Sequence, residues 1–348
     1  MMLLRNIFKF QSNYYRFSSK FQSNFERIPS KLITCNLCTL RKKNTIGNIV
    51  KYWRQEFENN SIDPIESIEY IVAHVIGTKK KRQLGSQQEK ELTTDEMEKI
   101  EMLSKRRLER IPVQYLIGEW EFRDITLKLV PPIFIPEPQT EMLIDFVLQR
   151  VSNSNFDSCE VLEVGCSTGA IILSLLNACN KIRAMALDTN INACNLTLEN
   201  ARTLKLDDRI TVINATLQED GTIKNSPEEK SIDLNKKKLD IIVSNPPYVT
   251  TKQYVKFPPE IKLHEDVRAT DGGPDGLRVV KPLLNYSANA LKPGGRLFIE
   301  INPVNSEYIP FYTAMNTKLK LKHEDTYKRF IKLRSICRTF EINLAQKN

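Results

Sequence analysis

The chain lacks the features that mark membrane, disulfide-rich and metal-binding proteins. Its 348 residues contain no run of about 18 apolar residues, so no membrane span is expected. The seven cysteines follow no regular spacing, which argues against a disulfide framework and favours a reducing compartment. The single C-x-x-C pair, Cys35 and Cys38, has no partner pair at zinc-ligand spacing, and only three histidines are present. We therefore expect no metal site.

Acidic side chains are absent from the first 25 residues, although the segment contains several serines. Its basic residues are Arg5, Lys9, Arg16 and Lys20, and the apolar residues between positions 3 and 10 can share one side of a helix. A positive amphipathic segment without acids is typical of a mitochondrial presequence. We therefore predict a targeting segment over residues 1–25 and a location in the mitochondrial matrix. A disordered basic tail is the alternative.

Basic residues outnumber acidic residues by 51 to 42, which gives a formal net charge of +9. This balance favours acidic partners, and RNA or a ribosome-associated protein would fit. A basic targeting segment together with solvated lysines would give the same excess. The sequence has no aromatic–basic interleaving of the kind that binds single-stranded nucleic acid. We therefore expect a protein partner, no direct nucleic-acid binding and, because no oligomeric signal is present, a monomer.

A small helical domain is predicted over residues 45–111. Apolar residues recur there at helical spacing, over 46–57, 65–76 and 97–108, with a polar loop expected between the second and third stretches. Gly77 provides a typical helix stop. Domains of this kind often bind a partner, so we expect this one to bind the substrate.

A β-hairpin linker is predicted over residues 112–137. Strand-like runs occur at 114–117 and 125–130, and a proline-rich turn follows them. The linker separates the helical domain from a catalytic domain, which we predict over residues 138–340.

From Glu160 onward the pattern alternates between strands and helices, which predicts a parallel sheet covered on both faces. Strands are expected at 161–164, 182–187, 210–213, 239–243 and 296–301, with a final antiparallel pair at 318–321 and 330–336. Helices are expected at 140–151, 170–179, 191–204 and 276–291. The polar stretch 218–238 has no periodicity and is expected to be a surface insertion. The predicted fold class is α/β, with a Rossmann-like sheet of seven strands.

A glycine-bearing turn follows the first of these strands, in the sequence Glu163-Val164-Gly165-Cys166-Ser167-Thr168-Gly169-Ala170. Small residues there let a ligand approach the backbone, and the start of the next helix offers free N–H groups. Asp188 ends the second strand, where a carboxylate can accept both ribose hydroxyl protons of a nucleoside. The candidate cofactor-binding residues are therefore Glu163, Gly165, Gly169 and Asp188. A tight turn without a ligand is the alternative for the glycines, and the absence of G-x-G-x-x-G disfavours a dinucleotide.

A second motif, Asn245-Pro246-Pro247-Tyr248, follows a buried apolar strand. It therefore lies at the carboxyl end of the sheet, where open α/β sheets bind ligands. The prolines remove two backbone donors and leave carbonyl acceptors. The amide oxygen of Asn245 and the carbonyl of Pro246 suit a planar NH₂ group, on which Tyr248 can stack. Holding both hydrogens orients a poor nitrogen nucleophile and adds electron density to it, which predicts methyl transfer to an amide or amino nitrogen.

Further motifs resemble the HemK/PrmC family, the protein-(glutamine-N5) methyltransferases of peptide-chain release factors. The resemblance covers about residues 45–340. Beyond the two motifs above, it is carried by Pro112-Val113-Gln114-Tyr115-Leu116-Ile117-Gly118-Glu119-Trp120-Glu121-Phe122, by Phe134-Ile135-Pro136-Glu137-Pro138-Gln139-Thr140-Glu141, and by Glu265-Asp266-Val267-Arg268-Ala269-Thr270-Asp271-Gly272-Gly273 with Asp275-Gly276-Leu277. N-P-P-Y alone is shared with adenine-N6 methyltransferases, whereas the other segments are more specific. Together with the leader-like segment, the sequence resembles the mitochondrial branch of the family.

The resemblance implies a substrate, a cofactor and roles for particular residues. The substrate is the glutamine of the Gly-Gly-Gln motif in class-1 mitochondrial release factors, and the cofactor is S-adenosylmethionine. Asn245 and Pro246 are implied to hold the glutamine amide, with Pro247 beside it and Tyr248 packed on it. Glu163, Gly165, Gly169, Asp188 and Asn245 are implied to border the cofactor, and Phe122 and Thr140 to close over it. The implied fold is a seven-stranded methyltransferase domain preceded by the helical domain and the hairpin.

The sequence departs from the family pattern at four positions. Glu137 replaces a usual arginine, Gln139 a usual acid, Ser167 a usual glycine, and Thr216 an acid commonly found near the adenine. These departures bear on cofactor affinity and leave open a non-catalytic relative that binds a release factor through its helical domain. An adenine-N6 methyltransferase acting on RNA or DNA is a second alternative, and a nicotinamide-dependent oxidoreductase is a third.

Overall fold

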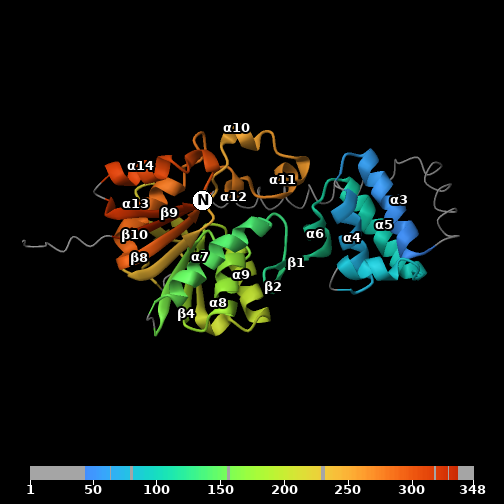
Figure 1. Ribbon diagram of the computed structural model, residues 1–348, viewed down its shortest axis with the longest axis horizontal. Coiled ribbons are helices and arrows are strands. Elements are labelled where there is room, and N and C mark those ends of the chain that lie inside the picture. Colours follow the sequence, from blue (N-terminus) through green and yellow to red (C-terminus); the bar gives the residue numbers. More distant parts are fainter. Residues whose placement is uncertain are drawn as a thin grey trace, which may run out of the picture. The chain divides into compact units, whose positions relative to one another are not determined.

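The computed structural model describes residues 44–62, 64–78, 81–154, 157–228, 232–316, 319–327 and 329–335 (Figure 1). The predicted targeting segment, and the pair Cys35 and Cys38, lie outside the described residues. The chain forms two compact units, with the boundary after Lys105.

The first unit is helical, as the periodicity predicted. It contains α3 (Ile46–Asn59), α4 (Pro64–Val75), the 3-10 helix η1 (Lys81–Gln87) and most of α5 (Thr94–Leu108). The helix α3 begins after Thr45, whose side chain accepts a hydrogen bond from the Asn48 N–H and so caps the helix. The predicted apolar face of α3 is confirmed, because Ile46, Ile49, Trp53 and Phe57 are all buried. The loop expected at 78–90 contains η1.

In the second unit, the end of α5 is followed by a short helix and a hairpin. The segment 114–117 was predicted as a strand, and this prediction is wrong, because residues Val113–Ile117 form the helix α6. Pro112 sets a φ of −52° just before the helix, and Gly118 ends it with a left-handed φ of 80°. The hairpin itself pairs β1 (Glu119–Phe122) with β2 (Ile125–Lys128) in antiparallel register.

The predicted sheet is present, with one additional strand, and the strand expected at 318–321 instead spans Leu321–Tyr327. Its strands are β3 (Cys159–Val164), β4 (Ile182–Asp188), β5 (Ile210–Leu217), β6 (Ile223–Asn225), β7 (Leu239–Ser244), β8 (Leu291–Glu300), β9 (Leu321–Tyr327) and β10 (Phe330–Ser335). Their order is β6-β5-β4-β3-β7-β8-β10-β9, and β3, β4, β5, β7 and β8 run parallel. The extra strand β6 pairs antiparallel with β5 and lies within 218–238. That stretch is therefore not only a surface insertion, because Ile223 and Leu234 are buried in the core.

Strand order reverses at β3, which has β4 on one side and β7 on the other. In open α/β sheets, a crevice forms outside the carboxyl ends of strands at such a switch point. The glycine-bearing turn follows the carboxyl end of β3, Asp188 is the last residue of β4, and Asn245 directly follows β7. The topology therefore brings both predicted motifs to one edge of one sheet.

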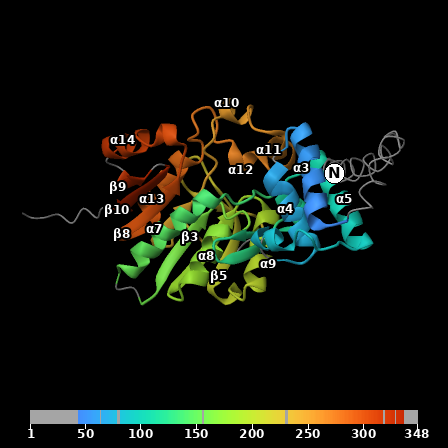
Figure 2. The same ribbon diagram turned by 45° about the vertical axis from the view of Figure 1, so that its right-hand side comes forward.

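Helices cover both faces of the sheet (Figures 1 and 2). One core cluster joins the hairpin and one face of the sheet to α7 (Glu141–Ser152), α8 (Ala170–Ala178) and the C-terminal part of α9 (Ile191–Thr203). The other joins the opposite face to α13 (Val280–Ala290) and α14 (Tyr308–Met315). Short elements complete the unit: η2 (Pro138–Thr140), η3 (Asp207–Arg209), α10 (Thr251–Tyr254), α11 (Pro259–His264), α12 (Val267–Thr270) and η4 (Pro303–Asn305). In the described part of the chain, no helix combines the length and apolar character needed to cross a membrane.

Candidate functional site

The two glycines of the turn after β3 have different structural roles. Both have left-handed backbones, with φ of +83° at Gly165 and +82° at Gly169. A Cβ built on Gly169 would lie 2.8 Å from Leu173 Cδ1, so packing against α8 explains this glycine. A Cβ on Gly165 would meet no heavy atom within 4 Å. Gly165 therefore borders open space that a ligand can fill, whereas Gly169 has a packing role.

A buried carboxylate and a half-buried one flank this turn. Glu163 is 1% exposed, and its Oε2 accepts a hydrogen bond of 3.1 Å from the Ile172 N–H. Asp188 accepts the Ser167 N–H at Oδ2, 3.0 Å away, and the Asn190 N–H at Oδ1, 2.8 Å away. Burial raises the pKa of both carboxyl groups. Each carboxylate oxygen has two acceptor positions, so Asp188 can accept further hydrogen bonds from a ligand.

Two polar side chains of α9, which the sequence analysis did not predict, donate hydrogen bonds to backbone carbonyls of the turn. Thr197 donates to the Ser167 carbonyl at 3.0 Å, and Asn200 donates to the Thr168 carbonyl at 2.9 Å. Asn200 also accepts the Lys128 N–H at 2.8 Å, which connects the turn to β2. A signal for them was available, because both lie on the apolar face of α9 beside Ala193, Leu196 and Ala201.

The second motif lies at the end of β7, and its side chains join a buried polar network. Asn245 Nδ2 donates to Thr140 Oγ1 at 3.2 Å, and Thr140 Oγ1 donates to Glu300 Oε2 at 2.9 Å. Tyr248 donates its hydroxyl hydrogen to Glu300 Oε1 at 2.9 Å. Arg329 Nη1 donates to both, 3.0 Å from the Tyr248 hydroxyl and 3.1 Å from Glu300 Oε1. The structure therefore brings together three predicted residues, Thr140, Asn245 and Tyr248.

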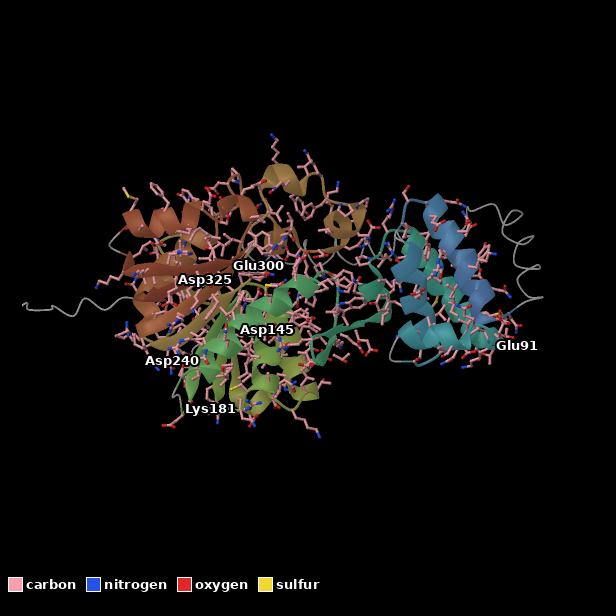
Figure 3. All side chains as sticks on the ribbon, in the orientation of Figure 1. Glu91, Asp145, Lys181, Asp240, Glu300 and Asp325 are labelled. Carbon is pink, nitrogen blue, oxygen red and sulfur yellow. The ribbon has the colours of Figure 1, made fainter. Side chains whose placement is uncertain are left out.

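Glu300 and Arg329 are members of this network that the sequence reasoning missed. Glu300 is 0% exposed and ends β8, in the interior of the α/β unit (Figure 3). A carboxylate between the apolar residues Ile299 and Ile301 of the predicted strand 296–301 was a signal for it, because a buried charge needs partners. Arg329 lies in the turn between β9 and β10, where the sequence gives no sign of its role. Burial and the neighbouring Glu300 raise the pKa of the Tyr248 phenol, so this hydroxyl remains a neutral donor.

Two further glycines, Gly272 and Gly276, are explained by contact with the second motif. A Cβ on Gly272 would lie 2.5 Å from the Pro247 carbonyl oxygen, and one on Gly276 would lie 2.4 Å from the Tyr248 carbonyl oxygen. Gly272 N also donates to the Val249 carbonyl at 2.8 Å. The backbone of residues 247–249 therefore lies so close to the backbone at Gly272 and Gly276 that a larger residue at either position would clash with it.

The side chains at the positions that depart from the family pattern form hydrogen bonds or ion pairs with neighbouring residues. Ser167 keeps a left-handed φ of +52° in the place of a glycine, at a cost of roughly 1–2 kcal/mol. Its hydroxyl donates to the Phe134 carbonyl at 3.3 Å. The hydroxyls of Thr216 and Thr189 are 3.1 Å apart. Glu137 lies 3.9 Å from Arg329 and accepts a hydrogen bond from Gln139.

Phe122 is 1% exposed and belongs to the core cluster that includes Leu143 and Ile144. Its closing over a cofactor stays a prediction.

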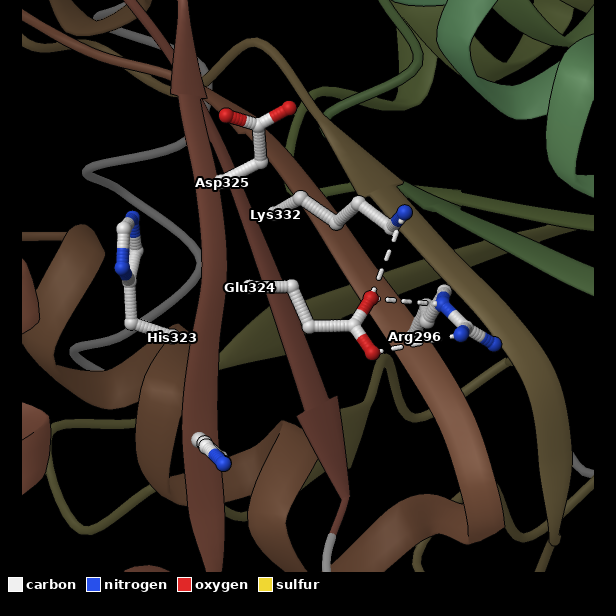
Figure 4. Close-up of a pocket in the computed structure, with 6 residues that line it drawn as sticks. Arg296, His323, Glu324, Asp325 and Lys332 are labelled. Atoms are coloured by element: carbon white, nitrogen blue, oxygen red, sulfur yellow. Dashed lines mark hydrogen bonds and ion pairs between the residues drawn. The ribbon is translucent and has the colours of Figure 1, made fainter.

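A separate hollow lies on strands β8, β9 and β10 (Figure 4). Its lining is mostly charged, and Glu324 accepts hydrogen bonds there from Arg296 at 2.8 and 3.2 Å and lies 3.3 Å from Lys332. No predicted site residue lines it. Among the described residues, no three His, Cys, Asp or Glu side chains are grouped closely enough to hold a metal ion.

Comparison with known proteins finds relatives for both the helical part of the chain and the sheet. A family model described as the PrmC N-terminal domain matches residues 48–118, and one described as the methyltransferase small domain matches residues 139–257. The chain is 39% identical over 280 residues to the MTRF1L release factor glutamine methyltransferase of Homo sapiens, covering 78% of this chain and 80% of that protein. It is 33% identical over 207 residues to the release factor glutamine methyltransferase of Synechocystis, covering 59% of this chain and 66% of that protein. The Gloeobacter violaceus enzyme of the same name is 29% identical over 255 residues, with 72% and 82% covered.

The resemblance noted in the sequence is confirmed by these matches, which include both the helical domain and the sheet. The chain belongs to the HemK/PrmC family of S-adenosylmethionine-dependent release factor glutamine methyltransferases.

Proposed function

We propose that this enzyme methylates N5 of the glutamine in the Gly-Gly-Gln motif of class-1 mitochondrial release factors, and so supports translation termination. The observation that carries the proposal is the fixed Asn245 amide at the end of β7, on the same edge of the sheet as Gly165 and Asp188. An acceptor for a planar NH₂ group and a nucleoside-binding turn thereby meet at one switch point.

The residues around the turn fit S-adenosylmethionine. Gly165 borders open space, and each oxygen of Asp188 has an acceptor position left after its backbone bond. These acceptors suit the two ribose hydroxyls, and the open space at Gly165 lets a cofactor lie against the backbone. When bound, S-adenosylmethionine supplies a methyl group on a positively charged sulfur.

The second motif accounts for the nitrogen. A glutamine amide is a poor nucleophile, because its lone pair is delocalised into the carbonyl group. Asn245 Oδ1 and the Pro246 carbonyl oxygen would accept its two N–H bonds and hold the nitrogen facing the methyl group. The nitrogen gains the methyl group and releases one proton to solvent, while the electron pair of the broken bond stays on sulfur. Positioning and electrostatics supply most of the rate enhancement, and no strong base is needed before attack.

The mitochondrial part of the proposal is supported by residues 1–25, whose basic, acid-free sequence resembles a presequence. The release factor as substrate is supported by the names of the human and bacterial relatives. Residues 44–105 form a compact helical unit, which we propose binds the release factor.

The test is methyl transfer from labelled S-adenosylmethionine to a purified mitochondrial class-1 release factor. The control is the same factor with its Gly-Gly-Gln glutamine changed to alanine. Label on the first protein alone is expected, and it would establish both the reaction and the side chain. Label on neither protein, with cofactor binding demonstrated by calorimetry, would overturn the proposed substrate and favour nucleic acid. Absence of cofactor binding would favour the non-catalytic relative.

Gly165→Ala should weaken cofactor binding by at least about tenfold, because the new methyl group enters the space where the ligand is proposed to lie. A matched control is Gly294→Ala in β8, where φ is +77° and a Cβ would also meet nothing within 4 Å. Both variants bear the same left-handed strain, roughly 1–2 kcal/mol. Calorimetry with S-adenosylmethionine and thermal unfolding of both variants check this. Equal affinities in the two would mean that Gly165 does not border the cofactor.

A further inference from the structure

The side chain of Asn245 has two ends that look alike in shape but are opposite in chemistry. Its Nδ2 end donates to Thr140, whereas no described residue donates a hydrogen bond to its Oδ1 end. We propose that the buried carboxylate of Glu300, acting through the Thr140 hydroxyl, fixes which end of the Asn245 amide faces the substrate. This inference rests on the proposed function in one respect, since it assumes that Asn245 Oδ1 accepts the substrate N–H.

The direction follows from counting protons along the chain of hydrogen bonds. An ionised carboxylate can only accept, and a hydroxyl carries one hydrogen. Thr140 must therefore give its hydrogen to Glu300 Oε2, at 2.9 Å, and it can only accept from Asn245, at 3.2 Å. The atom of Asn245 that faces Thr140 is then Nδ2. The oxygen is left at the other end, as a free acceptor.

Glu300 is suited to start this chain because hydrogen bonds fix its orientation. Its side chain is 0% exposed, and its second oxygen, Oε1, accepts from Tyr248 at 2.9 Å and from Arg329 at 3.1 Å. The guanidinium of Arg329 balances the carboxylate, which would otherwise be costly to bury. With Oε1 held by two donors, Oε2 is directed to Thr140. Glu300 and Thr140 are thus positioning residues that act through Asn245.

The alternative orientation of Asn245 would disable the site. Turning the amide over would place Oδ1 against the Thr140 oxygen with no hydrogen between them. It would also present an NH₂ group to the NH₂ group of the substrate, so neither could accept. The network therefore selects the acceptor orientation before the substrate binds, which is a form of preorganisation.

Glu300→Gln provides an unusually direct test, because it reverses the chain. The glutamine oxygen would face its two donors, Tyr248 and Arg329, so its NH₂ group would face Thr140. Thr140 would then accept from residue 300 and donate to Asn245, which favours the inverted amide. We expect kcat to fall by about 10- to 100-fold, equivalent to about 1.4–2.7 kcal/mol at 1.36 kcal/mol per factor of ten, with the KM for S-adenosylmethionine within about twofold of wild type.

Substitutions at Thr140 separate the hydroxyl from the shape of the side chain. Thr140→Ser keeps the hydroxyl and should retain kcat within about threefold, whereas Thr140→Val removes it and should lower kcat by about tenfold. In the double variant that combines Thr140→Val with Glu300→Gln, the second substitution should cause no further fall in kcat, because no hydroxyl remains to transmit its effect. Independent effects of the two substitutions, or equal activities for the Ser and Val variants, would overturn the inference.

Asp240→Asn is the matched control for losing a buried carboxylate in the same sheet (Figure 3). Asp240 is 8% exposed at the start of β7, where it accepts the Glu160 N–H at 2.9 Å and pairs with Lys292 at 2.8 Å. Among the described residues, no hydrogen bond or ion pair joins Asp240 to Asn245 or Thr140. Asp240→Asn should reduce the melting temperature yet leave kcat unchanged, whereas a matching fall in kcat would reduce the Glu300 effect to general destabilisation.

A readout without turnover distinguishes failure of this inference from failure of the proposed function. In protein labelled with ¹⁵N-asparagine, the Nδ2 signal of Asn245, assigned by its loss in Asn245→Ala, should report the hydrogen bond to Thr140. The signal should persist in Thr140→Ser and shift in Thr140→Val and Glu300→Gln. If these shifts occur but wild-type enzyme does not label a release factor, the proposed function fails and the positioning role stands. An unchanged signal in both variants would overturn the positioning role, whatever the enzyme methylates.

Discussion

Asn245→Ala should abolish methyl transfer while leaving the fold intact. We expect kcat to fall by at least about 10²–10³-fold, the loss usual when an electrostatic contact to the reacting group is removed. Asn245 follows the last residue of β7 and is half-buried, and its side chain donates a hydrogen bond to Thr140. Removing its amide therefore opens no cavity among the apolar side chains of the sheet. It removes the donor to Thr140 together with the acceptor that we propose for the glutamine N–H.

Three measurements check this result: label transfer to the release factor, cofactor affinity by calorimetry, and thermal unfolding. Asn289→Ala is a matched control, because Asn289 is exposed on α13 and donates only to the Asn285 carbonyl, at 3.1 Å. The control should transfer label at the wild-type rate. Near-normal transfer by Asn245→Ala would contradict the proposed mechanism, and a large fall in melting temperature would point to a structural role instead.

Much of the fold could be predicted from the sequence because local patterns and the final packing agree. The parallel strands are rich in buried apolar residues, so β7 was visible from its apolar core, residues 241–243, shortly before Asn245. The helix α6 was missed because its five residues, V-Q-Y-L-I, include β-branched and aromatic side chains that also favour strands. There the flanking Pro112 and Gly118 decided the outcome. The strand β6 was missed because a three-residue edge strand shows no periodicity.

The polar network at the site was only half visible from the sequence. Thr140 and Asn245 were singled out by their motifs, yet they are 105 positions apart, and no local pattern predicts their hydrogen bond. Glu300 is a charged residue among apolar ones in its strand. This pattern predicts that it has a hydrogen-bond or ion-pair partner but does not say which residue that is. Arg329 reaches this partner from the turn between β9 and β10, and that contact depends on the register of an antiparallel strand pair. Register of this kind is set by long-range packing, which one sequence does not display.

Asp188→Ala should weaken the binding of S-adenosylmethionine by roughly 1–3 kcal/mol, a factor of about 5 to 150 in Kd, through the loss of charge-assisted hydrogen bonds. Asp188 ends β4, and its two oxygens already accept the Ser167 and Asn190 N–H groups. It therefore organises the turn and, by our proposal, also receives the ribose. Asp188→Asn should be impaired as well, because its NH₂ end would face one of these backbone donors. Asp145→Asn, at an exposed carboxylate of α7, is the control.

The pH dependence of this affinity separates the two roles of Asp188. Burial raises the pKa of the Asp188 carboxyl group, so protonation begins at a higher pH than for an exposed aspartate. Ribose hydroxyls donate to the charged form, so the affinity of the wild-type enzyme should fall as the pH is lowered toward this raised pKa. Asp188→Asn cannot titrate there and should bind weakly with no such fall. If wild type and Asp188→Asn show the same pH profile, the carboxylate supports the turn but does not bind the ribose. If Asp188→Ala keeps the wild-type affinity, the ribose lies elsewhere.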